Sequence, residues 1–382
     1  MRKFSSVFDG RGARIGGARM GTALCMAALA GCSSSKSGSR ADSGHPANAA
    51  AAAASSGVGL TGAGSSFAYP IYSAWANTYA QKTGVKVNYQ SVGSGAGIKQ
   101  LSEQIVDFGA SDGPMTDQQL AEAKGGPILH FPTVMGGVSV TYNLPTVKQP
   151  LKLSGAVIAG IYLGKITNWN APQIAALNPN VALPDQSIVV THRTESSGTT
   201  YIFTDYLSAV SPAWASGPGK AQVINWPVGL GGKGSEGVTG LVKQSPGGIG
   251  YVELSYAKSN NLPSALIQNA AGAWIEPTLA SVTAAAASAV TTLPPNTDYR
   301  ISIVNAPGKD AYPISSFTWI LLYRHMTDAT KAKELTDFMR WAYSTGESSA
   351  DSLDYAPLPQ SMIAPLTARL DSITGPTPGS TP

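Results

Sequence analysis

The chain has 382 residues, of which 43% are hydrophobic and only 13% charged, with 42 glycines and 26 prolines. This length and composition predict two globular lobes connected by loops. Its formal charge of +4 comes from the first 31 residues, because removing their five basic and one acidic side chains leaves 21 of each sign (26 minus 5 and 22 minus 1). A neutral body without a basic tract argues against nucleic acid as a partner. No cluster of His, Cys and Asp predicts a metal, and no cofactor is expected.

The N-terminus has the pattern of a cleavable leader. A basic region precedes an apolar stretch over residues 20–30, which is shorter than the about 20 residues of a membrane-spanning helix. Residues 29–32, Leu-Ala-Gly-Cys, resemble the lipobox of a lipoprotein signal, so we expect residues 1–31 to be removed and Cys32 to become the lipidated first residue. The alternative is that Cys32 merely ends an apolar stretch. Because Cys25 lies in the leader, the mature chain is expected to have no intrachain disulfide.

A tether and a first strand-to-helix junction follow. Residues 32–57 are mostly Ser, Ala and Gly, which predicts a flexible tether. Beyond it the pattern alternates strands and helices, as expected for an α/β protein. The junction at 62–70, Gly-Ala-Gly-Ser-Ser-Phe-Ala-Tyr-Pro, follows a short apolar strand. Its proline suits the first turn of a helix, and Gly84 suits the end of that helix.

A second junction of this kind and a turn with a carboxylate follow the first helix. The glycine- and serine-rich stretch at 91–97 ends a strand at 85–89 and opens a helix whose apolar side is expected to include Ile98, Leu101 and Ile105. The segment 106–114 then carries Asp112 on a turn after a short apolar strand. Asp112 could act on a ligand, or it could cap the turn ahead of Pro114.

The stretch 193–200, Arg-Thr-Glu-Ser-Ser-Gly-Thr-Thr, is the most informative part of the sequence. It follows the apolar run 188–191 and combines a guanidinium, hydroxyls and a flexible backbone where a strand gives way to a helix. Helix N-termini present unpaired N–H groups, and arginine offers forked donors for tetrahedral oxyanions. The alternatives are a helix cap without a ligand and a surface salt bridge of Arg193. Three such junctions can converge at the carboxyl ends of parallel strands, where open α/β sheets bind ligands.

These blocks resemble the phosphate-binding protein of the bacterial high-affinity phosphate ABC importer, a family of the periplasmic substrate-binding protein superfamily. The resemblance extends from about Leu60 to about Ala364 and includes the blocks 60–64, 106–112, 131–134, 161–166, 229–234, 248–253 and 353–356. It implies an α/β, two-lobed periplasmic-binding-protein-like fold of type II, with the ligand cleft between lobes joined by two crossover segments.

The resemblance also implies the residues that hold the anion. Glu195 stands where the family commonly has aspartate, and we expect it to support Arg193. Ser66 replaces the more usual threonine, and Phe67 is expected to contribute its backbone N–H, although a phenylalanine after serine is more often a core residue. The expected phosphate-binding residues are Ser66, Phe67, Ser94, Asp112, Arg193, Ser197, Gly198 and Thr199.

Asp112 has a particular role in this interpretation, because a carboxylate repels an anion unless it performs a task. Phosphate near neutral pH still carries a proton that an ionised aspartate can accept, whereas sulfate has none to give. An unpaired buried charge costs several kcal/mol, so discrimination of about a thousandfold is within reach.

The lobes are expected to be discontinuous in sequence. We expect residues 58–137 with 309–371 to form lobe 1, residues 138–308 to form lobe 2, and residues 372–382 to be a disordered tail. The ligand would then draw the lobes together by hinge closure, for which periplasmic binding proteins are an established example.

The sequence therefore predicts a non-enzymatic, monomeric receptor in the cell envelope, on the periplasmic or extracytoplasmic face of the membrane. It would bind inorganic phosphate, be held to the membrane by lipid on Cys32, and deliver its ligand to the permease and ATPase of an ABC phosphate importer. Two alternatives remain open: a secreted phosphomonoesterase with Ser66 or Ser197 as nucleophile, and a receptor for another oxyanion such as sulfate or molybdate. The four histidines show no triad spacing, and His192, beside the site, is expected to point away from it.

Overall fold

The computed structural model describes residues 57, 59–290, 293 and 297–376. The leader, Cys32 and nearly all of the expected tether lie outside these residues. No helix in the described part of the chain is long and apolar enough to cross a membrane.

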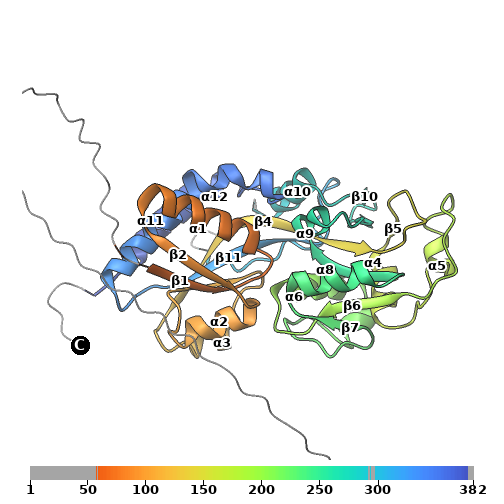
Figure 1. The fold of residues 1–382 in the computed structure, drawn as a ribbon, viewed down its shortest axis with the longest axis horizontal. Helices are drawn as coiled ribbons and strands as arrows, with labels where there is room; N and C mark the ends of the chain where they lie inside the picture. Colours follow the sequence, from red (N-terminus) through yellow and green to blue (C-terminus); the bar gives the residue numbers. More distant parts are fainter. Residues whose placement is uncertain (1–56, 58, 291–292, 294–296, 377–382) are drawn as a thin grey trace, which may run out of the picture. The chain divides into compact units, whose positions relative to one another are not determined.

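An eight-stranded mixed sheet with the order β2-β1-β3-β11-β4-β8-β6-β7 organises the fold, and a three-stranded sheet β10-β9-β5 accompanies it (Figure 1). The strands are β1 Gly59–Gly64, β2 Lys86–Ser91, β3 Phe108–Ser111, β4 Ile128–Tyr142, β5 Lys152–Leu153, β6 Val189–Arg193, β7 Leu230–Gly232, β8 Gly248–Glu253, β9 Leu266–Gln268, β10 Trp274–Ile275 and β11 Ser315–Tyr323.

Helices connect and cover these strands. The α-helices are α1 Tyr69–Thr83, α2 Ser94–Ser102, α3 Asp117–Ala121, α4 Gly155–Tyr162, α5 Pro172–Ala175, α6 Gly198–Val210, α7 Pro212–Ala215, α8 Gly234–Gln244, α9 Leu254–Ser259, α10 Leu279–Val290, α11 Ala329–Ser344 and α12 Gln360–Arg369. Three short 3₁₀ helices are η1 Gly346–Ser349, η2 Asp351–Leu353 and η3 Leu370–Ser372.

The long strand β4 joins the two lobes of the fold. Its residues up to Gly137 pair antiparallel with β11, and from Val138 onward it pairs antiparallel with β8. We call the part built on β2, β1, β3, β11 and the first segment of β4 lobe 1, and the part built on the second segment of β4 with β8, β6 and β7 lobe 2. In each lobe three strands are parallel to one another: β1 to β2 and β3, and β6 to β7 and β8.

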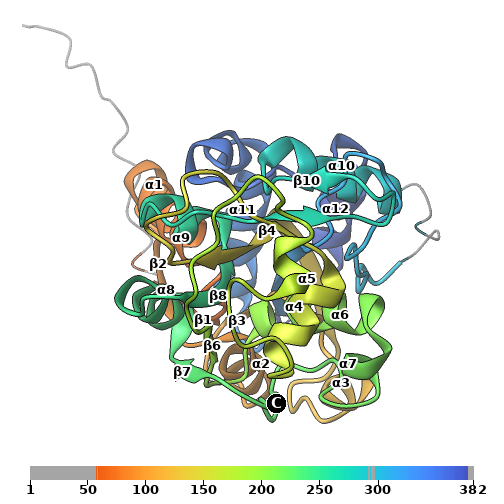
Figure 2. The same ribbon diagram turned by 90° about the vertical axis from the view of Figure 1, so that its right-hand side faces the viewer.

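Each lobe is a sheet between helices. In lobe 1, α1 and α11 cover one face and α2 and α3 lie against the other (Figure 1). In lobe 2, α8 lies on one side of β6, β7 and β8, and α4 and α6 lie on the other (Figure 2). The mixed α/β architecture predicted from the sequence is thus confirmed.

The first two helices follow the predicted signals closely, with one error. Helix α1 has Pro70 in its first turn and ends at Thr83, and the following Gly84 has a φ of 80° and caps the helix with its N–H. This left-handed conformation favours glycine. Helix α2 begins at Ser94 as expected but ends at Ser102, so Ile105 lies beyond it and is 67% exposed. The prediction that Ile105 belongs to the apolar side of this helix is wrong, because the helix stops before reaching that position.

The C-terminal segment also differs from expectation. Ile373 is buried, and the N–H of Thr374 donates to the carbonyl of Arg324 at 2.9 Å. Residues 372–374 therefore pack against the body of lobe 1, whereas the sequence predicted a tail from residue 372 onward.

Candidate functional site

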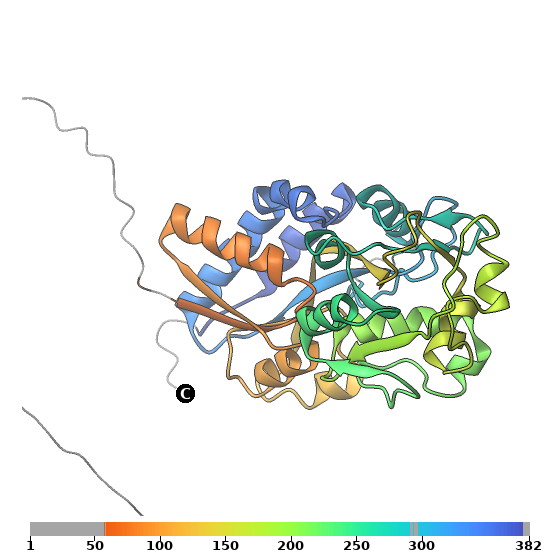
Figure 3. The same ribbon diagram turned by 45° about the vertical axis from the view of Figure 1, so that its right-hand side comes forward.

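Polar side chains gather where the parallel strands of both lobes end. The segments after β1, β2 and β3 carry Ser66, Ser94 and Asp112, whereas β6 ends at Arg193 and Ser197 precedes α6. Figures 1 and 3 show β1 and β2 (orange) running toward α6 and α8 (green). Because parallel strands end at the same edge of a sheet, the junctions meet there, and the predicted convergence of the loops is confirmed.

Asp112 lies in the middle of this site with 1% of its surface exposed. Its Oδ1 accepts hydrogen bonds from the hydroxyls of Ser65 at 2.5 Å and Thr318 at 2.8 Å. From the described residues its Oδ2 accepts only a long bond, of 3.3 Å, from the hydroxyl of Ser94. The carboxyl is thus held by side chains and not by the backbone of its turn, so the alternative of a turn cap is wrong.

The two carboxyl oxygens of Asp112 are therefore unequal. Oδ1 already has two short bonds, while Oδ2 faces lobe 2, since a Cβ built on Gly198 would lie 2.6 Å from it. Burial raises the pKa of Asp112 to about 6, although the bonds from Ser65 and Thr318 and the charge of Arg193 act in the opposite direction. At neutral pH Asp112 is mainly ionised and has acceptor capacity left on Oδ2.

Arg193 reaches the same place from lobe 2. As the last residue of β6 it is fixed by its backbone N–H, which donates to the hydroxyl of Tyr251 at 3.1 Å. Its side chain is 1% exposed, so the alternative of a surface salt bridge is wrong. The guanidinium crosses to lobe 1, where Nη2 donates to the hydroxyl of Ser66 at 2.8 Å.

Glu195 orients this guanidinium. Its Oε1 accepts from Nε of Arg193 at 2.7 Å and also from Nη2. Partial burial favours a higher pKa for Glu195, but the charge and hydrogen bonds of Arg193 outweigh it and lower the pKa. The longer carboxylate in place of aspartate thus reaches the arginine, as expected.

The first turn of α6 faces lobe 1. The side chain of Ser197 caps the helix by accepting from the N–H of Thr200 at 3.1 Å. The N–H groups of Gly198 and Thr199 come before those that can bond within a helix, and they add the partial positive charge of a helix N-terminus. A side chain at Gly198 would collide with Ser94 Oγ, at 2.4 Å, and with Asp112, so glycine allows this close approach.

The remaining expected residues of lobe 1 are also buried here. The hydroxyl of Ser94 accepts from the N–H of Asp112 at 3.2 Å. The ring of Phe67 lies in the core against Tyr355, with ring centroids 6.1 Å apart, while its carbonyl accepts from the Tyr355 hydroxyl at 2.5 Å. Phe67 is thus a core residue by its side chain, and only its backbone is available to the site.

Four residues of this site were not predicted from the sequence. Ser65 stood beside Ser66 in the same serine pair, and Glu253 closed the block 248–253, so both had a signal. Ser235 is the second residue of α8, just after a glycine-rich loop. Thr318 gave no signal, because it sits in the apolar strand β11, 206 residues from the Asp112 that it contacts.

Other polar side chains near the site do not enter it. His192 stacks on Trp226 with centroids 4.9 Å apart, as expected for a side chain directed away from Arg193. Lys99 and Lys233 are exposed. In the described residues, no group of three or more His, Cys, Asp or Glu side chains is placed to hold a metal ion.

The two serines considered as nucleophiles have other contacts. Ser66 Oγ accepts from Arg193 and lies 3.0 Å from Ser235 Oγ, and Ser197 Oγ caps α6. An arginine donor and a backbone N–H do not activate a hydroxyl as a general base would. The arrangement is suited to binding an anion between two lobes, which defines a two-lobed solute-binding protein of the periplasmic type.

Comparisons with known proteins agree with this class. Residues 46–345 match the PBP superfamily domain. The phosphate-binding protein PstS of Pasteurella multocida is 44% identical over 311 residues, covering 81% of this chain and 89% of that protein. PstS of Methanocaldococcus jannaschii is 38% identical, covering 72% and 75%. A solved structure of a phosphate-binding protein from Stenotrophomonas maltophilia has a TM-score of 0.64 at 20% identity, covering 81% and 93%. The chain belongs to the PBP superfamily and, within it, to the PstS family of solute-binding proteins, which are not enzymes.

Proposed function

We propose that this protein binds inorganic phosphate between its lobes, outside the cytoplasmic membrane, and delivers it to the permease and ATPase of an ABC phosphate importer. The observation that carries the proposal is that a buried carboxylate from lobe 1, Asp112, and a buried guanidinium from lobe 2, Arg193, lie close enough for their charges to interact. The relatives named phosphate-binding protein PstS support the same ligand.

The ligand would be held mainly by neutral donors. We assign hydroxyl donors to both lobes, backbone N–H donors to Phe67 and to the first turn of α6, and one cation, Arg193. Many neutral donors and one charge-assisted fork match the oxygens of a tetrahedral anion. The proposed ligand-binding set is Ser66, Phe67, Ser94, Asp112, Arg193, Ser197, Gly198 and Thr199, with Glu195 in support.

Oδ2 of Asp112 would recognise the protonated ligand by accepting a hydrogen bond from its proton. It has one long hydrogen bond, whereas Oδ1 has two shorter ones. An ionised carboxylate oxygen can accept the proton of hydrogen phosphate, while sulfate has no proton and would leave two negative groups in contact. The buried setting makes that repulsion cost several kcal/mol, which is about a thousandfold in affinity.

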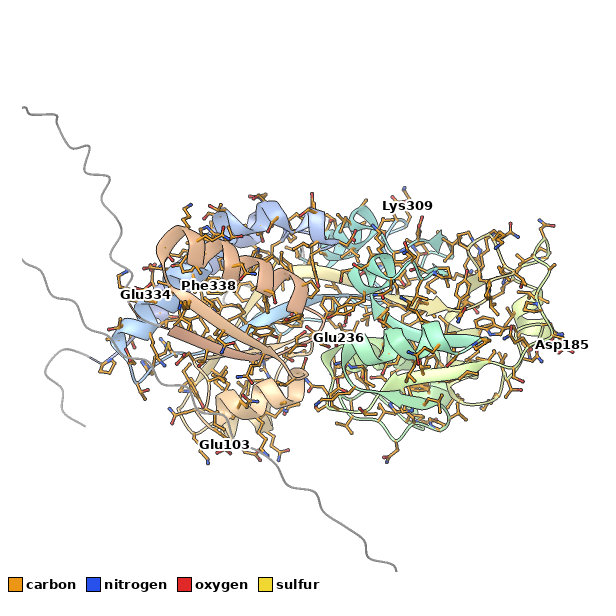
Figure 4. The ribbon with its side chains drawn as sticks, viewed as in Figure 1. Glu103, Asp185, Glu236, Lys309, Glu334 and Phe338 are labelled. Atoms are coloured by element: carbon orange, nitrogen blue, oxygen red, sulfur yellow. The ribbon has the colours of Figure 1, made fainter. Side chains whose placement is uncertain are left out.

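The test is a calorimetric titration with phosphate and with sulfate, repeated with Asp112→Asn. We expect phosphate to bind, a large excess of sulfate not to displace it, and Asp112→Asn to weaken phosphate binding and narrow the gap between the two anions. Asp185→Asn is the matched control, since Asp185 is a carboxylate at the far end of lobe 2 (Figure 4). If sulfate competed equally with phosphate for the wild type, the assignment of phosphate as the ligand would be refuted.

Ligand exchange would require the lobes to separate. We propose residues 58–137 with 309–371 as lobe 1 and residues 138–308 as lobe 2, with hinge motion at the two crossings near residues 136–138 and 304–308. The change of partner along β4 supports the first crossing. Contacts between the lobes, such as the bond from Arg193 to Ser66, belong to the closed form.

The place of action is the extracytoplasmic side of the membrane. We infer that Cys32 carries a lipid anchor, that residues 32–57 act as a tether, and that the protein works as a monomer. The lipobox-like residues 29–32 support the anchor. Labelling of expressing cells with a fatty acid tests it: the wild type should incorporate the label and Cys32→Ser should not.

A further inference from the structure

A second carboxyl, Glu253, lies beneath the site on the lobe 2 side and has no role in the proposed binding set. It is the last residue of β8 and is 1% exposed. Its Oε1 accepts from the hydroxyls of Thr199 at 3.0 Å and Ser235 at 3.1 Å. Its Oε2 is buried without a hydrogen-bond partner among the described residues. A buried carboxyl oxygen without a partner is costly and calls for a physical explanation.

The same two hydroxyls connect Glu253 to Arg193. Nη1 of Arg193 donates to Oγ1 of Thr199 and to Oγ of Ser235, both at 3.1 Å. Each hydroxyl therefore accepts from the guanidinium and donates to the carboxyl. Together these four side chains form a closed ring of hydrogen bonds, and both Arg193 and Ser235 of this ring contact the hydroxyl of Ser66.

This ring limits what the hydroxyls can do for a ligand. A hydroxyl has a single proton, so Thr199 cannot donate to Glu253 and to an anion at the same time. The same limit applies to Ser235, whose hydroxyl lies 3.0 Å from that of Ser66 and donates its one proton to Glu253. An ionised Glu253 thus competes with the anion for the donors that the anion needs.

The charges around Glu253 favour neutralising it when an anion arrives. Arg193 on β6 and Asp112 after β3 face it, as do the phenols of Tyr256 on α9 and Tyr355 after η2. Burial raises the pKa of both phenols, so they stay neutral. A bound anion adds negative charge to a group that has one cation, Arg193, and two other carboxylates, Asp112 and the Glu195 that is paired with Arg193.

We propose that Glu253 takes up a proton when phosphate binds, which frees the hydroxyl protons of Thr199 and Ser235 to point at the anion. The proton comes from solvent or buffer, and Oε2 is the free position for it. The proposal rests on the proposed function of the site. Burial also raises the pKa of Glu253 to about 7, so the uptake is inexpensive near neutral pH.

Calorimetry at pH 8 tests this in two buffers of different ionisation enthalpy, comparing the wild type with Glu253→Gln. Phosphate in solution has largely lost its second proton at this pH, and its own proton exchange is common to both proteins. We expect the wild type to take up close to one proton more per phosphate than Glu253→Gln. Between pH 7 and 9 its affinity should fall relative to that variant by up to about tenfold per pH unit.

Glu276→Gln is the matched control, because Glu276 is an exposed carboxylate between β10 and α10 and is not part of this group of side chains. It should keep the proton uptake of the wild type. Equal proton uptake by the wild type and Glu253→Gln would overturn the proposal. The absence of any phosphate binding by the wild type would instead overturn the proposed function.

A measurement on the wild type alone covers the case in which Glu253→Gln fails to fold. The infrared difference spectrum between free and phosphate-bound protein at pH 8 should show the C=O stretch of a newly protonated carboxyl. Protein labelled with ¹³C at the glutamate side-chain carboxyl should show this band shifted, which separates Glu253 from Asp112. A spectrum without a label-sensitive band would contradict protonation of a glutamate.

Discussion

Gly95 in α2 provides a test of closure that leaves the proposed ligand-binding side chains intact. Its N–H donates across the lobes to the carbonyl of Ser196 at 3.0 Å. A Cβ at this position would lie 2.0 Å from Oγ and 2.3 Å from Cβ of Ser196. The hydroxyl can rotate away, but the Cβ can move only with its backbone. Gly95→Ala should therefore keep α2 and Ser196 apart.

The size of the effect follows from these contacts. Ordinary carbon contacts need about 3.5 to 4.0 Å, so the two segments must separate by more than about 1 Å. Overpacking costs about 1 to 3 kcal/mol and the lost hydrogen bond about 1 kcal/mol. The closed form thus loses about 2 to 4 kcal/mol, which is about 30-fold to 700-fold in phosphate affinity. The open form is spared, because alanine is favoured over glycine within a helix by up to about 1 kcal/mol.

Calorimetry would give the affinity, and small-angle X-ray scattering would give the radius of gyration with and without phosphate. Gly240→Ala is the matched control, since Gly240 lies inside α8 and a Cβ there has nothing within 4 Å. We expect this control to bind and close like the wild type. If Gly95→Ala matched it in affinity and in the change of radius, closure through this contact would be refuted.

Three further predictions concern single side chains. Arg193→Lys replaces the forked guanidinium by a single ammonium and should weaken phosphate binding, measured by calorimetry, by about 30-fold or more. The reason is that charge-assisted hydrogen bonds are worth about 1.5 to 3 kcal/mol each. Unchanged affinity would contradict the role of the guanidinium. Thr318→Val removes the 2.8 Å bond to Asp112 and so should raise the pKa of Asp112 further above its usual value. Asp112 must be ionised to accept a proton, so as pH is lowered the variant should lose phosphate affinity at a higher pH than the wild type. Phosphate titrations over a range of pH would measure this, and the same pH dependence in both proteins would count against it. Burial raises the pKa of Glu347 from 4.5 to about 7, so its contribution to stability is present below pH 4.5 and is lost as pH rises through 7. Urea denaturation should accordingly show that the free energy of unfolding of Glu347→Gln, relative to that of the wild type, is larger at pH 8 than at pH 5. The same difference at both pH values would disprove the pH linkage.

The sequence determined much of the local structure and the parts of the site that local rules control. Pro70 and Gly84 predicted the limits of α1, because the ring of proline and the left-handed conformation of glycine are local properties. The strand-to-helix junctions predicted where donors would be found. Ile105 was placed wrongly, because an apolar period does not say where a helix stops.

Tertiary structure alone decided which side chains form hydrogen bonds with one another or lie close enough for their charges to interact. Thr318 and Asp112 meet because β11 pairs antiparallel with β3, and nothing near either residue predicts that pairing. Glu253 reaches Thr199 and Ser235 only because β8 lies beside β6 and beneath α8. Hydrogen bonds and desolvation act over a few ångströms in space, whereas the sequence fixes distances only along the chain, so these partnerships exist only in the folded protein.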